Sequence, residues 1–292
     1  MRFLVTGSKG QLGTELLARL EGTHHEVLGV DLDTCDITDR DSVLGLIGSF
    51  QPEAVIHGAA FTAVDLCEST PETAYAVNSL ATRFIADGAR RVGAHLVYVS
   101  TDYVFDGTKV DPYVEWDQPN PVSIYGKSKL GGEQEVDPEW TIARTSWVCS
   151  ASGNNMVKTV LRLAATHDSL SFVSDQVGNP TFAGDLAGKL IQLAISRVPG
   201  VHHVTNSGSV SWYEFVQEIL EAGGHSRDKV QPQTTAEFLA NRATDAPPMA
   251  PRPANSVLDN FALRTSGLGE LRDFREALAE VVSQLRSGGS IS

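Results

Sequence analysis

The sequence predicts an α/β protein, a doubly wound parallel sheet with a small C-terminal lobe. Over residues 1–150, apolar runs of strand length alternate with longer segments whose apolar residues recur at helical spacing. Strands that alternate with helices in this way form parallel βαβ units. A glycine-rich turn between the first strand and the first helix supports the same architecture. Beyond residue 150 the pattern is less regular and richer in Gly, Pro and Asn, which indicates a lobe built largely from loops.

The elements follow from these patterns in order. The expected strands cover residues 2–7, 25–31, 54–60, 94–100 and 139–148, and the expected helices 11–21, 37–50, 71–93 and 123–133. Pro71 stands at the first position of the longest helix, where its missing N–H costs nothing. Later helices are expected at about 183–197, 211–222 and 270–286, with turn-rich or proline-rich loops at 175–182 and 244–256.

These elements predict a division of the chain. We expect residues 1–150 to form a dinucleotide-binding, Rossmann-like domain, with a helix at about 183–200 packing back on it. Residues 151–182 and 201–286 are expected to form mainly the substrate-binding lobe, and 287–292 a flexible tail. Ligands of open α/β sheets bind beyond the carboxyl ends of the strands, where such a lobe closes over them.

Composition and charge exclude several classes of protein. The 292 residues carry a formal net charge of −13, which argues against a nucleic-acid partner because such a partner needs a basic surface. An anionic small ligand must then be held by local arginines, backbone amides or helix N-termini. No apolar run approaches the roughly 20 residues that cross a membrane. The first strand begins at once, without a leader segment.

The cysteines point to a reducing compartment. Cys35, Cys67 and Cys149 are scattered and show no CxxC spacing. This usage is typical of ordinary buried thiols and indicates neither a disulfide framework nor a zinc site. We therefore expect a cytoplasmic protein.

The turn "TGSKGQLG" places Gly7, Gly10 and Gly13 three residues apart, between a strand and a helix. Glycines permit a tight turn and a close backbone approach, and a helix N-terminus presents free amides to a pyrophosphate. The spacing is GxxGxxG rather than the usual GxGxxG. The context predicts a dinucleotide site; the alternative is a purely structural turn.

The second strand ends in Asp31, 18 positions after Gly13, where an acidic residue binds ribose hydroxyls. Because no arginine follows to hold a 2′-phosphate, NADH is favoured, although Lys9 in the loop would tolerate NADPH. The cofactor is therefore predicted to be NADH or NADPH. Asp36 and Ile37 are expected beside the adenine; for Asp36 the alternative is a helix N-cap.

Tyr125 and Lys129 are four apart in "SIYGKSKLGGE" and share one helix face. An ammonium near a phenol lowers the pKa of the phenol and makes it a usable general acid. Ser100 and Thr101 follow a buried strand, so their hydroxyls are expected at the same sheet edge. We predict that Thr101, Tyr125 and Lys129 form a reducing site in which a nicotinamide gives hydride to a carbonyl carbon and Tyr125 gives a proton to its oxygen. The alternative is a solvated helix face.

The glycine loop, "STDYVF" and "YGKSK" resemble the extended short-chain dehydrogenase/reductase superfamily. The series "TGSKGQLG", "AAFTAVDLCE", "AYAVNS", "STDYVFDG", "RTSWV", "DQVGNPT" and "RPANSVLD" is similar, over nearly the whole length, to the dTDP-4-dehydrorhamnose reductase family. The resemblance implies reduction of the 4-keto group of a dTDP-6-deoxy-4-keto sugar, giving dTDP-L-rhamnose. The partner it implies is thus a nucleotide-sugar substrate.

The resemblance also implies contacts, and several have simpler alternatives. It implies cofactor contacts at Gly7, Gly10, Gln11, Leu12, Asp36, Ala59, Ala60, Thr62, Tyr125 and Lys129, to which we add Gly13, Asp31, Ile37, Asn78 and Ser100. It implies sugar contacts at Val64, Asp102, Tyr103 and Trp147, with Arg252 as a candidate for the phosphates. Val64 and Trp147 are alternatively core, Asp102 a turn cap and Arg252 an exposed loop charge. Asn78 is expected to hold a water or a backbone carbonyl.

Departures from the family pattern keep the substrate open. Leu66, Cys149, Met156 and Asn179 replace the residues usual in the family, so a 4-ketoreductase for another NDP-deoxysugar is an alternative. Some members use Mg²⁺ at a homodimer contact; Glu15 matches one such position and Asp185 is a candidate for another, the alternative being solvated carboxylates. We expect a monomer or a homodimer.

Two rival functions share this fold. The 4,6-dehydratases need a glutamate after the aspartate that follows the threonine, and Tyr103 stands there instead, so dehydration is disfavoured. A non-catalytic regulatory subunit, resembling the accessory subunit of methionine adenosyltransferase, is the other rival. The intact Thr101, Tyr125 and Lys129 argue against it.

Overall fold

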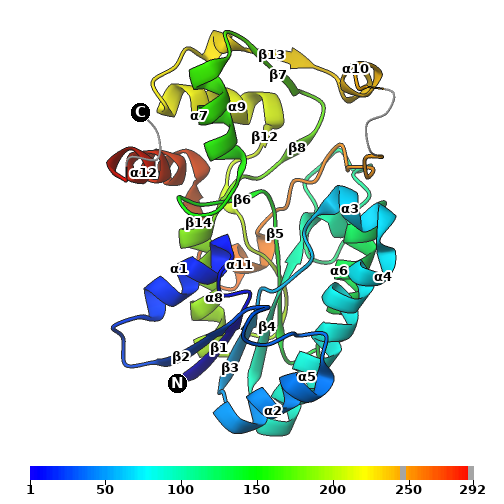
Figure 1. The fold of residues 1–292 in the computed structure, drawn as a ribbon, viewed down its shortest axis with the longest axis vertical. Helices are drawn as coiled ribbons and strands as arrows, with labels where there is room; N and C mark the ends of the chain where they lie inside the picture. The colour runs from blue at the N-terminus through cyan, green and yellow to red at the C-terminus, as the bar shows by residue number, and fades with distance from the viewer. Residues whose placement is uncertain (244–247, 289–292) are drawn as a thin grey trace.

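The computed structural model describes residues 1–243 and 248–288 and contains the predicted doubly wound parallel sheet (Figure 1). In space the sheet runs β10 (Gly200–His203), β5 (Thr141–Thr145), β4 (His95–Thr101), β3 (Ala54–His57), β1 (Arg2–Thr6), β2 (Glu26–Val30), all paired in parallel. The edge strand β10 was not expected from the sequence. Because β2 and β3 lie on opposite sides of β1, a crevice opens beyond the carboxyl ends of these three strands.

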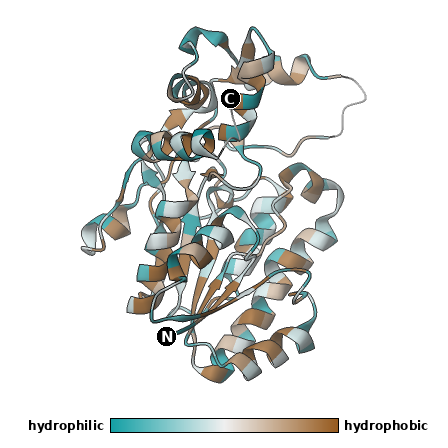
Figure 2. Ribbon diagram, turned by 60° about the vertical axis from the view of Figure 1, so that its left-hand side comes forward, coloured by the Kyte–Doolittle hydropathy of each residue, from teal (hydrophilic) through white to brown (hydrophobic). Residues whose placement is uncertain are grey.

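Helices cover both faces of this sheet. On one face α1 (Gln11–Leu20) packs against α8 (Ala183–Ser196), and on the other α2 (Arg40–Phe50) packs against α5 (Ala81–Val92). The central strands are apolar along their length, whereas the helices are apolar on one side (Figure 2). This pattern is what burial of a parallel sheet on both faces requires.

The helix expected over 71–93 is one helical run with an irregular middle. It comprises α4 (Pro71–Tyr75), a π-helical turn at Ala76–Leu80, and α5. Asn78 lies in the π-helical turn and its side chain binds the backbone of Phe61. Such turns often occur at functional sites. The neighbouring α3 (Val64–Ser69) and α6 (Ile124–Glu133) pack beside this run.

The strand expected over 139–148 is wrong beyond Thr145. The backbone changes direction at Trp147, whose φ is +46°. It continues as β6 (Val148–Cys149), which pairs with β9 (Thr181–Phe182) outside the main sheet. The Trp147 ring stacks on Trp212 with 3.6 Å between ring centroids. The main-sheet strand therefore ends at Thr145, before this left-handed residue.

The C-terminal lobe has its own apolar core. That core gathers side chains from α7 (Met156–Thr166), α9 (Trp212–Ala222) and α12 (Phe274–Ser287). Helix α7 was not expected. Helix α12 begins later than residue 270 because Leu271–Asp273 forms β14 and Asp273 caps the helix by accepting from the Arg275 N–H. The remaining elements are β7 (Leu170–Val173), β8 (Val177–Gly178), β11 (Asn206–Ser207), β12 (Val210–Ser211), β13 (Val230–Gln233), α10 (Thr235–Ala240), α11 (Phe261–Thr265) and 3₁₀ turns at Asp102–Val104 and Arg227–Lys229.

Two sequence expectations fall partly outside the described residues, namely 244–247 of the proline-rich loop and 289–292 of the expected tail. Residues 175–181 and 252–259 pair through Val177, whose N–H donates to Ala254 and whose carbonyl accepts from the Ser256 N–H, both at 2.8 Å. These two motif segments therefore form one structural unit.

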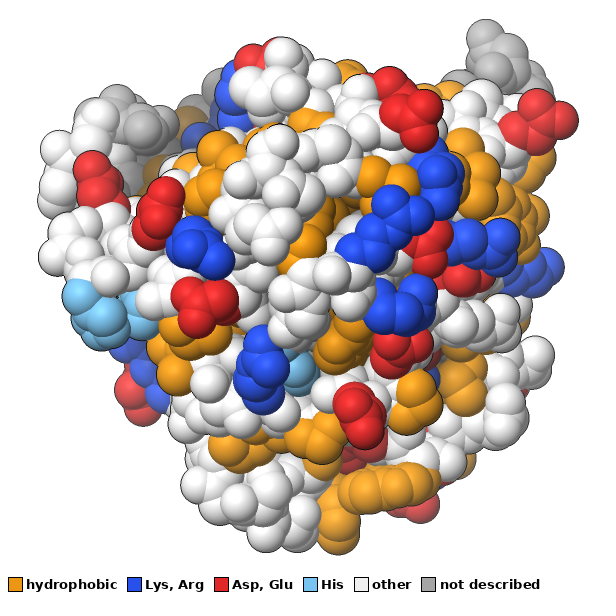
Figure 3. Space-filling view, turned by 90° about the horizontal axis from the view of Figure 1, so that it is seen from below, with side chains coloured by type: hydrophobic (Ala, Val, Ile, Leu, Met, Phe, Trp, Pro, Cys, Tyr) orange, Lys and Arg blue, Asp and Glu red, His pale blue; other side chains and the backbone are white. Residues whose placement is uncertain are grey.

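The surface carries both signs of charge. Seen from below, basic side chains stand beside acidic ones (Figure 3), in keeping with pairs such as Arg83–Glu135. Cys35, Cys67 and Cys149 are buried free thiols, as expected. Within residues 1–243 and 248–288, no helix has the length and apolar character needed to span a bilayer.

Candidate active site

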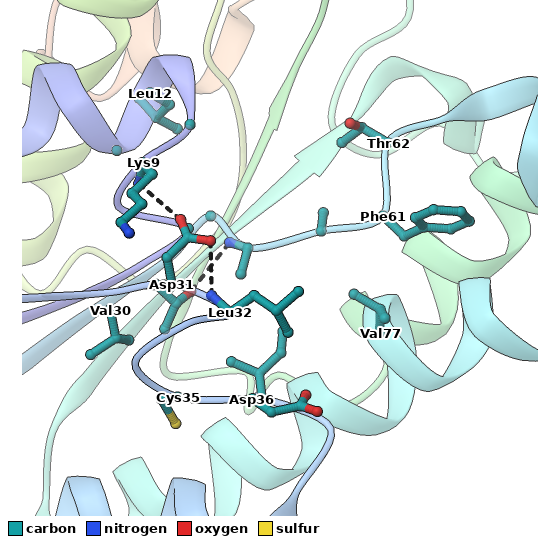
Figure 4. Close-up of a pocket in the computed structure, with 18 of the residues that line it drawn as sticks. Lys9, Leu12, Val30, Asp31, Leu32, Cys35, Asp36, Phe61, Thr62 and Val77 are labelled. Carbon is teal, nitrogen blue, oxygen red and sulfur yellow. Dashed lines mark hydrogen bonds between the residues drawn. The ribbon is translucent and has the colours of Figure 1, made fainter. Parts of the chain in front are cut away.

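The crevice beyond β1, β2 and β3 holds a cavity of about 590 Å³ (Figure 4). Eleven of the predicted cofactor residues line it: Gly7, Gly10, Gln11, Leu12, Gly13, Asp31, Asp36, Ile37, Ala59, Ala60 and Thr62. Lys9, Leu32, Cys35, Phe61 and Val77, not predicted as contacts, complete much of the wall. The structure thus brings the sequence-distant parts of the predicted dinucleotide site together.

The glycine loop has the shape of a phosphate cradle. Gly7 has a φ of +71°, which glycine adopts without strain. A Cβ at Gly13 would lie 2.1 Å from the Gly7 carbonyl oxygen, so the loop closes this tightly only with glycine there. Helix α1 begins without a side-chain cap, which leaves its N-terminal amides for a ligand. The loop therefore fits a dinucleotide pyrophosphate.

The acidic residues at the adenosine end are held by local backbone. Asp31 accepts from the N–H groups of Lys9, at 2.8 Å, and Leu32, at 2.9 Å, as Figure 4 shows. Asp36 accepts from the N–H and hydroxyl of Thr38. Helix α2 is capped by Asp39, so the N-cap interpretation of Asp36 is wrong.

Asn78 and Ser100 lie behind the cavity wall. The Asn78 amide accepts from the Phe61 N–H at 2.8 Å and donates to the Phe61 carbonyl oxygen at 3.1 Å. It thus holds a backbone carbonyl, one of the two roles predicted for it, and fixes a wall residue. The Ser100 hydroxyl donates to Glu133 at 2.6 Å, and the same carboxylate binds Arg144 through two bonds of 2.9 and 2.7 Å. This buried network ties α6 to β4 and β5.

Thr101 and Tyr125 meet at the carboxyl end of β4, and Lys129 lies one turn further along the same helix as Tyr125. Thr101 is the last residue of the strand, and α6 carries the other two, which are buried. Burial raises the pKa of Tyr125 well above its usual value, and a hydrogen bond with Thr101 opposes that rise. The phenol is therefore protonated at neutral pH.

The prediction that Lys129 lowers the Tyr125 pKa is wrong, because burial raises that pKa. The Lys129 Nζ donates to the Val99 carbonyl oxygen at 2.7 Å, and Lys129 is not among the main influences on the Tyr125 pKa. Burial lowers the pKa of Lys129 to about 7, while the Glu133 carboxylate opposes this fall. Desolvation outweighs the pairwise attraction that the i, i+4 spacing suggests.

A second cavity, of about 810 Å³, lies in the C-terminal lobe. Its wall is made of Tyr103, Met156, Ser171, Phe172, Val173, Gln176, Trp212, Gln233, Thr235, Phe238, Leu239, Met249, Ala250, Pro251 and Arg252. Of the predicted substrate contacts, only Tyr103 and Arg252 line it. The other wall residues were not predicted as substrate contacts, although Gln176 stands in the motif "DQVGNPT".

The two cavities flank Tyr125. Phe61 lines the first cavity, Tyr103 lines the second, and both pack against the small apolar cluster that contains Tyr125. The rings of Tyr103 and Tyr125 lie 5.6 Å apart, edge to face. The Tyr125 phenol thus stands between the predicted dinucleotide crevice and a second ligand-sized space.

Three other predicted substrate contacts lie outside both cavity walls. Asp102 is buried; one carboxylate oxygen accepts from the Thr101 hydroxyl at 2.9 Å and the other has no partner, and burial raises the Asp102 pKa to about 6. Val64 packs on the cluster around Tyr125, and Trp147 packs in the lobe core. Both side chains are partly buried at the edges of these clusters.

The family departures occupy different environments. Met156 lines the second cavity, and Cys149 is buried in the lobe core, whereas Leu66 is exposed. Asn179 is buried, accepts from the Leu258 N–H at 2.8 Å and donates to the Gly208 carbonyl oxygen at 2.9 Å. Met156 thus faces the second cavity, and Asn179 lines a smaller cavity of about 210 Å³.

The carboxylates considered for Mg²⁺ do not gather into a metal site within this chain. Asp185 binds Asn206 and Arg272, each at 2.8 Å. Across residues 1–243 and 248–288, no three His, Cys, Asp or Glu side chains group as metal ligands.

Comparison with known proteins places the chain in a family. The model of the RmlD substrate binding domain matches residues 1–287. A dTDP-4-dehydrorhamnose reductase of Aggregatibacter actinomycetemcomitans is 40% identical over 294 residues, covering 96% of this chain and 98% of the relative. A probable dTDP-4,6-dihydroxy-2-methyloxan-3-one 4-ketoreductase of Streptomyces antibioticus is 39% identical over 287 residues, covering 96% and 94%.

A solved structure supports the same family assignment. The dTDP-4-dehydrorhamnose reductase of Bacillus anthracis, in complex with NADP, superimposes with a TM-score of 0.90 at 36% identity, covering 97% of this chain and 99% of that one. With the glycine loop, the buried tyrosine and lysine, and the paired motif segments in place, the chain belongs to the RmlD family, the family of the dTDP-4-dehydrorhamnose reductases.

Proposed function

We propose that this protein uses NADPH or NADH to reduce the 4-keto group of a dTDP-4-dehydro-6-deoxyhexose, converting dTDP-4-dehydro-L-rhamnose to dTDP-L-rhamnose in the cytoplasm. The observation that carries the proposal is the position of Tyr125 between the two cavities, with Thr101 hydrogen-bonded to it. The names of the relatives support the same reaction.

The first cavity would hold the dinucleotide. The loop from Gly7 to Gly13 would receive the pyrophosphate, and Asp31 the adenosine ribose. When bound, the reduced nicotinamide supplies hydride to the carbonyl carbon. Lys9 pairs with Asp33 beside this end of the cavity and supplies the one nearby cation that a 2′-phosphate would meet among the described lining residues.

Tyr125 would supply the proton. Its phenol stays protonated at neutral pH because burial raises its pKa. The Thr101 hydroxyl donates to Asp102 and accepts from the Tyr103 N–H, which fixes its oxygen beside the phenol. A carbonyl oxygen placed there would accept the tyrosine proton as charge develops on it. Lys129, charged below about pH 7, would stabilise the phenolate that remains.

The second cavity would take the nucleotide end of the substrate. Phe172, Trp212 and Phe238 offer faces for a base, Gln176 and Gln233 offer amides, and Arg252 offers a guanidinium for phosphates. A protein with a net charge of −13 repels an anionic substrate overall, and Arg252 would compensate for this locally by binding the phosphates.

A second candidate is a 4-ketoreductase for another deoxysugar nucleotide. The relative of Streptomyces antibioticus bears such a name, and Met156, a family departure, lines the second cavity. Different sugars would share the hydride and proton steps and differ in their contacts with the wall.

The test is oxidation of NADPH and of NADH with enzymatically generated dTDP-4-dehydro-L-rhamnose, with the product identified by chromatography. Turnover to dTDP-L-rhamnose supports the proposal and gives the cofactor preference. Turnover only with another keto sugar favours the second candidate. Cofactor binding without turnover of any keto sugar would favour the regulatory-subunit alternative.

A further inference from the structure

Arg252 is held in place by Asp65, a residue of the motif "AAFTAVDLCE" that was not predicted as a contact. Its guanidinium donates to both oxygens of the Asp65 carboxylate, at 2.8 and 3.0 Å, and to the Ala250 carbonyl oxygen at 2.7 Å. The Asp65 carboxylate also accepts from the Ala250 N–H at 2.9 Å. One aspartate therefore fixes both the side chain and the loop backbone at this point of the second cavity.

Asp65 comes from a segment that borders the first cavity, whereas Arg252 lines the second. Asp65 lies in the first turn of α3, directly after the segment that supplies Phe61 and Thr62 to the first cavity. Ala250 and Arg252 line the second cavity. The pair thus connects two segments that are 185 residues or more apart in the chain and border different cavities.

The bidentate pair leaves part of the guanidinium for a ligand. Three of the five N–H donors of Arg252 are used by Asp65 and Ala250. A hydrogen bond with Tyr103 involves a fourth, and burial of the guanidinium is compensated by these partners, so its pKa stays above the usual value. An arginine oriented in this way loses little rotamer entropy when an anion arrives.

We propose that Asp65 is a positioning residue for the substrate: by clamping Arg252 and the Ala250 backbone, it sets the guanidinium for the diphosphate of the nucleotide sugar. The inference rests on the proposed function, because it requires a nucleotide diphosphate in the second cavity. Asp65 itself touches neither the reacting atoms nor the cofactor cavity wall among the described residues.

The test is isothermal titration of the full-length protein with dTDP and, separately, with NADPH. For Asp65→Asn, which keeps the side-chain size but removes the charge, we expect about tenfold weaker dTDP binding, in line with loss of a charge-assisted hydrogen bond. NADPH affinity should be unchanged. With the keto sugar, KM should rise by the same factor while kcat at saturation stays within about twofold. Asp65→Glu should recover part of the dTDP affinity.

Glu135→Gln is the matched control. Glu135 also receives a bidentate guanidinium, that of Arg83 at 2.9 and 2.7 Å, but neither residue lines the two cavities. This variant should bind dTDP and NADPH as the wild type does. Equal dTDP affinity in wild type and Asp65→Asn, or tighter binding by the variant, overturns the positioning role. Failure of the wild type to bind dTDP at all contradicts the proposed function instead.

Discussion

The Lys129 ammonium donates to the Val99 carbonyl oxygen, 2.7 Å away, and lies 4.1 Å from the centre of the Tyr98 ring. The position of the ammonium is therefore set by strand β4 rather than by Tyr125, the residue with which Lys129 shares a helix face. The Tyr98 ring and the Val99 carbonyl both favour the ammonium form of Lys129. Burial outweighs them and lowers the Lys129 pKa to about 7.

We expect kcat/KM for the keto sugar to fall as pH rises above about 7, because Lys129 then loses the charge that would stabilise the phenolate. The pH dependence of kcat/KM reports groups of the free enzyme, so it is the measurement to make. In Glu133→Gln the opposing carboxylate is gone, and the fall should begin at lower pH. A profile that stays flat from neutral to alkaline pH would contradict this role.

Replacing Tyr125 by Phe should reduce kcat by about 100-fold or more, the usual contribution of a general acid. NADPH affinity should change little, since Tyr125 lies outside the wall of the first cavity. Steady-state kinetics and NADPH titration measure the two effects separately. The control is Tyr75→Phe, because Tyr75 is exposed and should leave both unchanged. If Tyr125→Phe kept most of its activity, another group would have to donate the proton.

Asp102 should make the protein less stable as pH rises from about 4 to 6. Burial raises its folded-state pKa from 3.8 to about 6, so in that window the folded protein binds a proton that the unfolded chain has released. The corresponding loss is on the order of 3 kcal/mol at neutral pH. Denaturant unfolding over a pH series tests this. Asp102→Asn should remove most of the slope.

A matched variant for that series is Asp41→Asn, since the Asp41 side chain is 96% exposed. It should keep the wild-type dependence on pH. Equal slopes for wild type and Asp102→Asn would show that the buried carboxylate does not titrate in this range.

Gly13→Ala should weaken NADPH binding by about tenfold or more. The added Cβ would lie 2.1 Å from the Gly7 carbonyl oxygen and 2.5 Å from the Ser8 Cα, so the phosphate loop must move, and such overpacking costs about 1–3 kcal/mol. Gly48→Ala is the control: it sits in α2 with open space around the new Cβ and should stabilise the protein by up to about 1 kcal/mol. Fluorescence titration with NADPH and thermal unfolding measure the pair; unchanged NADPH binding by Gly13→Ala would count against the cradle.

The first cavity was largely predictable because its parts carry local signals. Gly7, Gly10 and Gly13 mark a turn, and Asp31 marks the end of the next strand. Parallel pairing then brings the carboxyl ends of β1, β2 and β3 together without further information. These rules predict the glycine loop and Asp31, whereas the contacts at Gln11, Leu12, Ala59, Ala60 and Thr62 were expected only from the family resemblance. The second cavity was not predictable, because the elements that form its wall, such as α9 with Trp212 and α10 with Phe238, approach one another only through the packing of the lobe.

The sequence by itself determined the sheet, the glycine turn and the placing of Thr101 and Tyr125 at one sheet edge, because these depend on periodicity and on where a strand ends. The tertiary structure alone decided that β10 completes the sheet, that Lys129 binds Val99 and that Asp65 clamps Arg252. These are contacts between segments far apart in the chain. A local pattern leaves many partners possible for each side chain, and burial and packing decide among them. These long-range contacts therefore form only when the whole chain has folded.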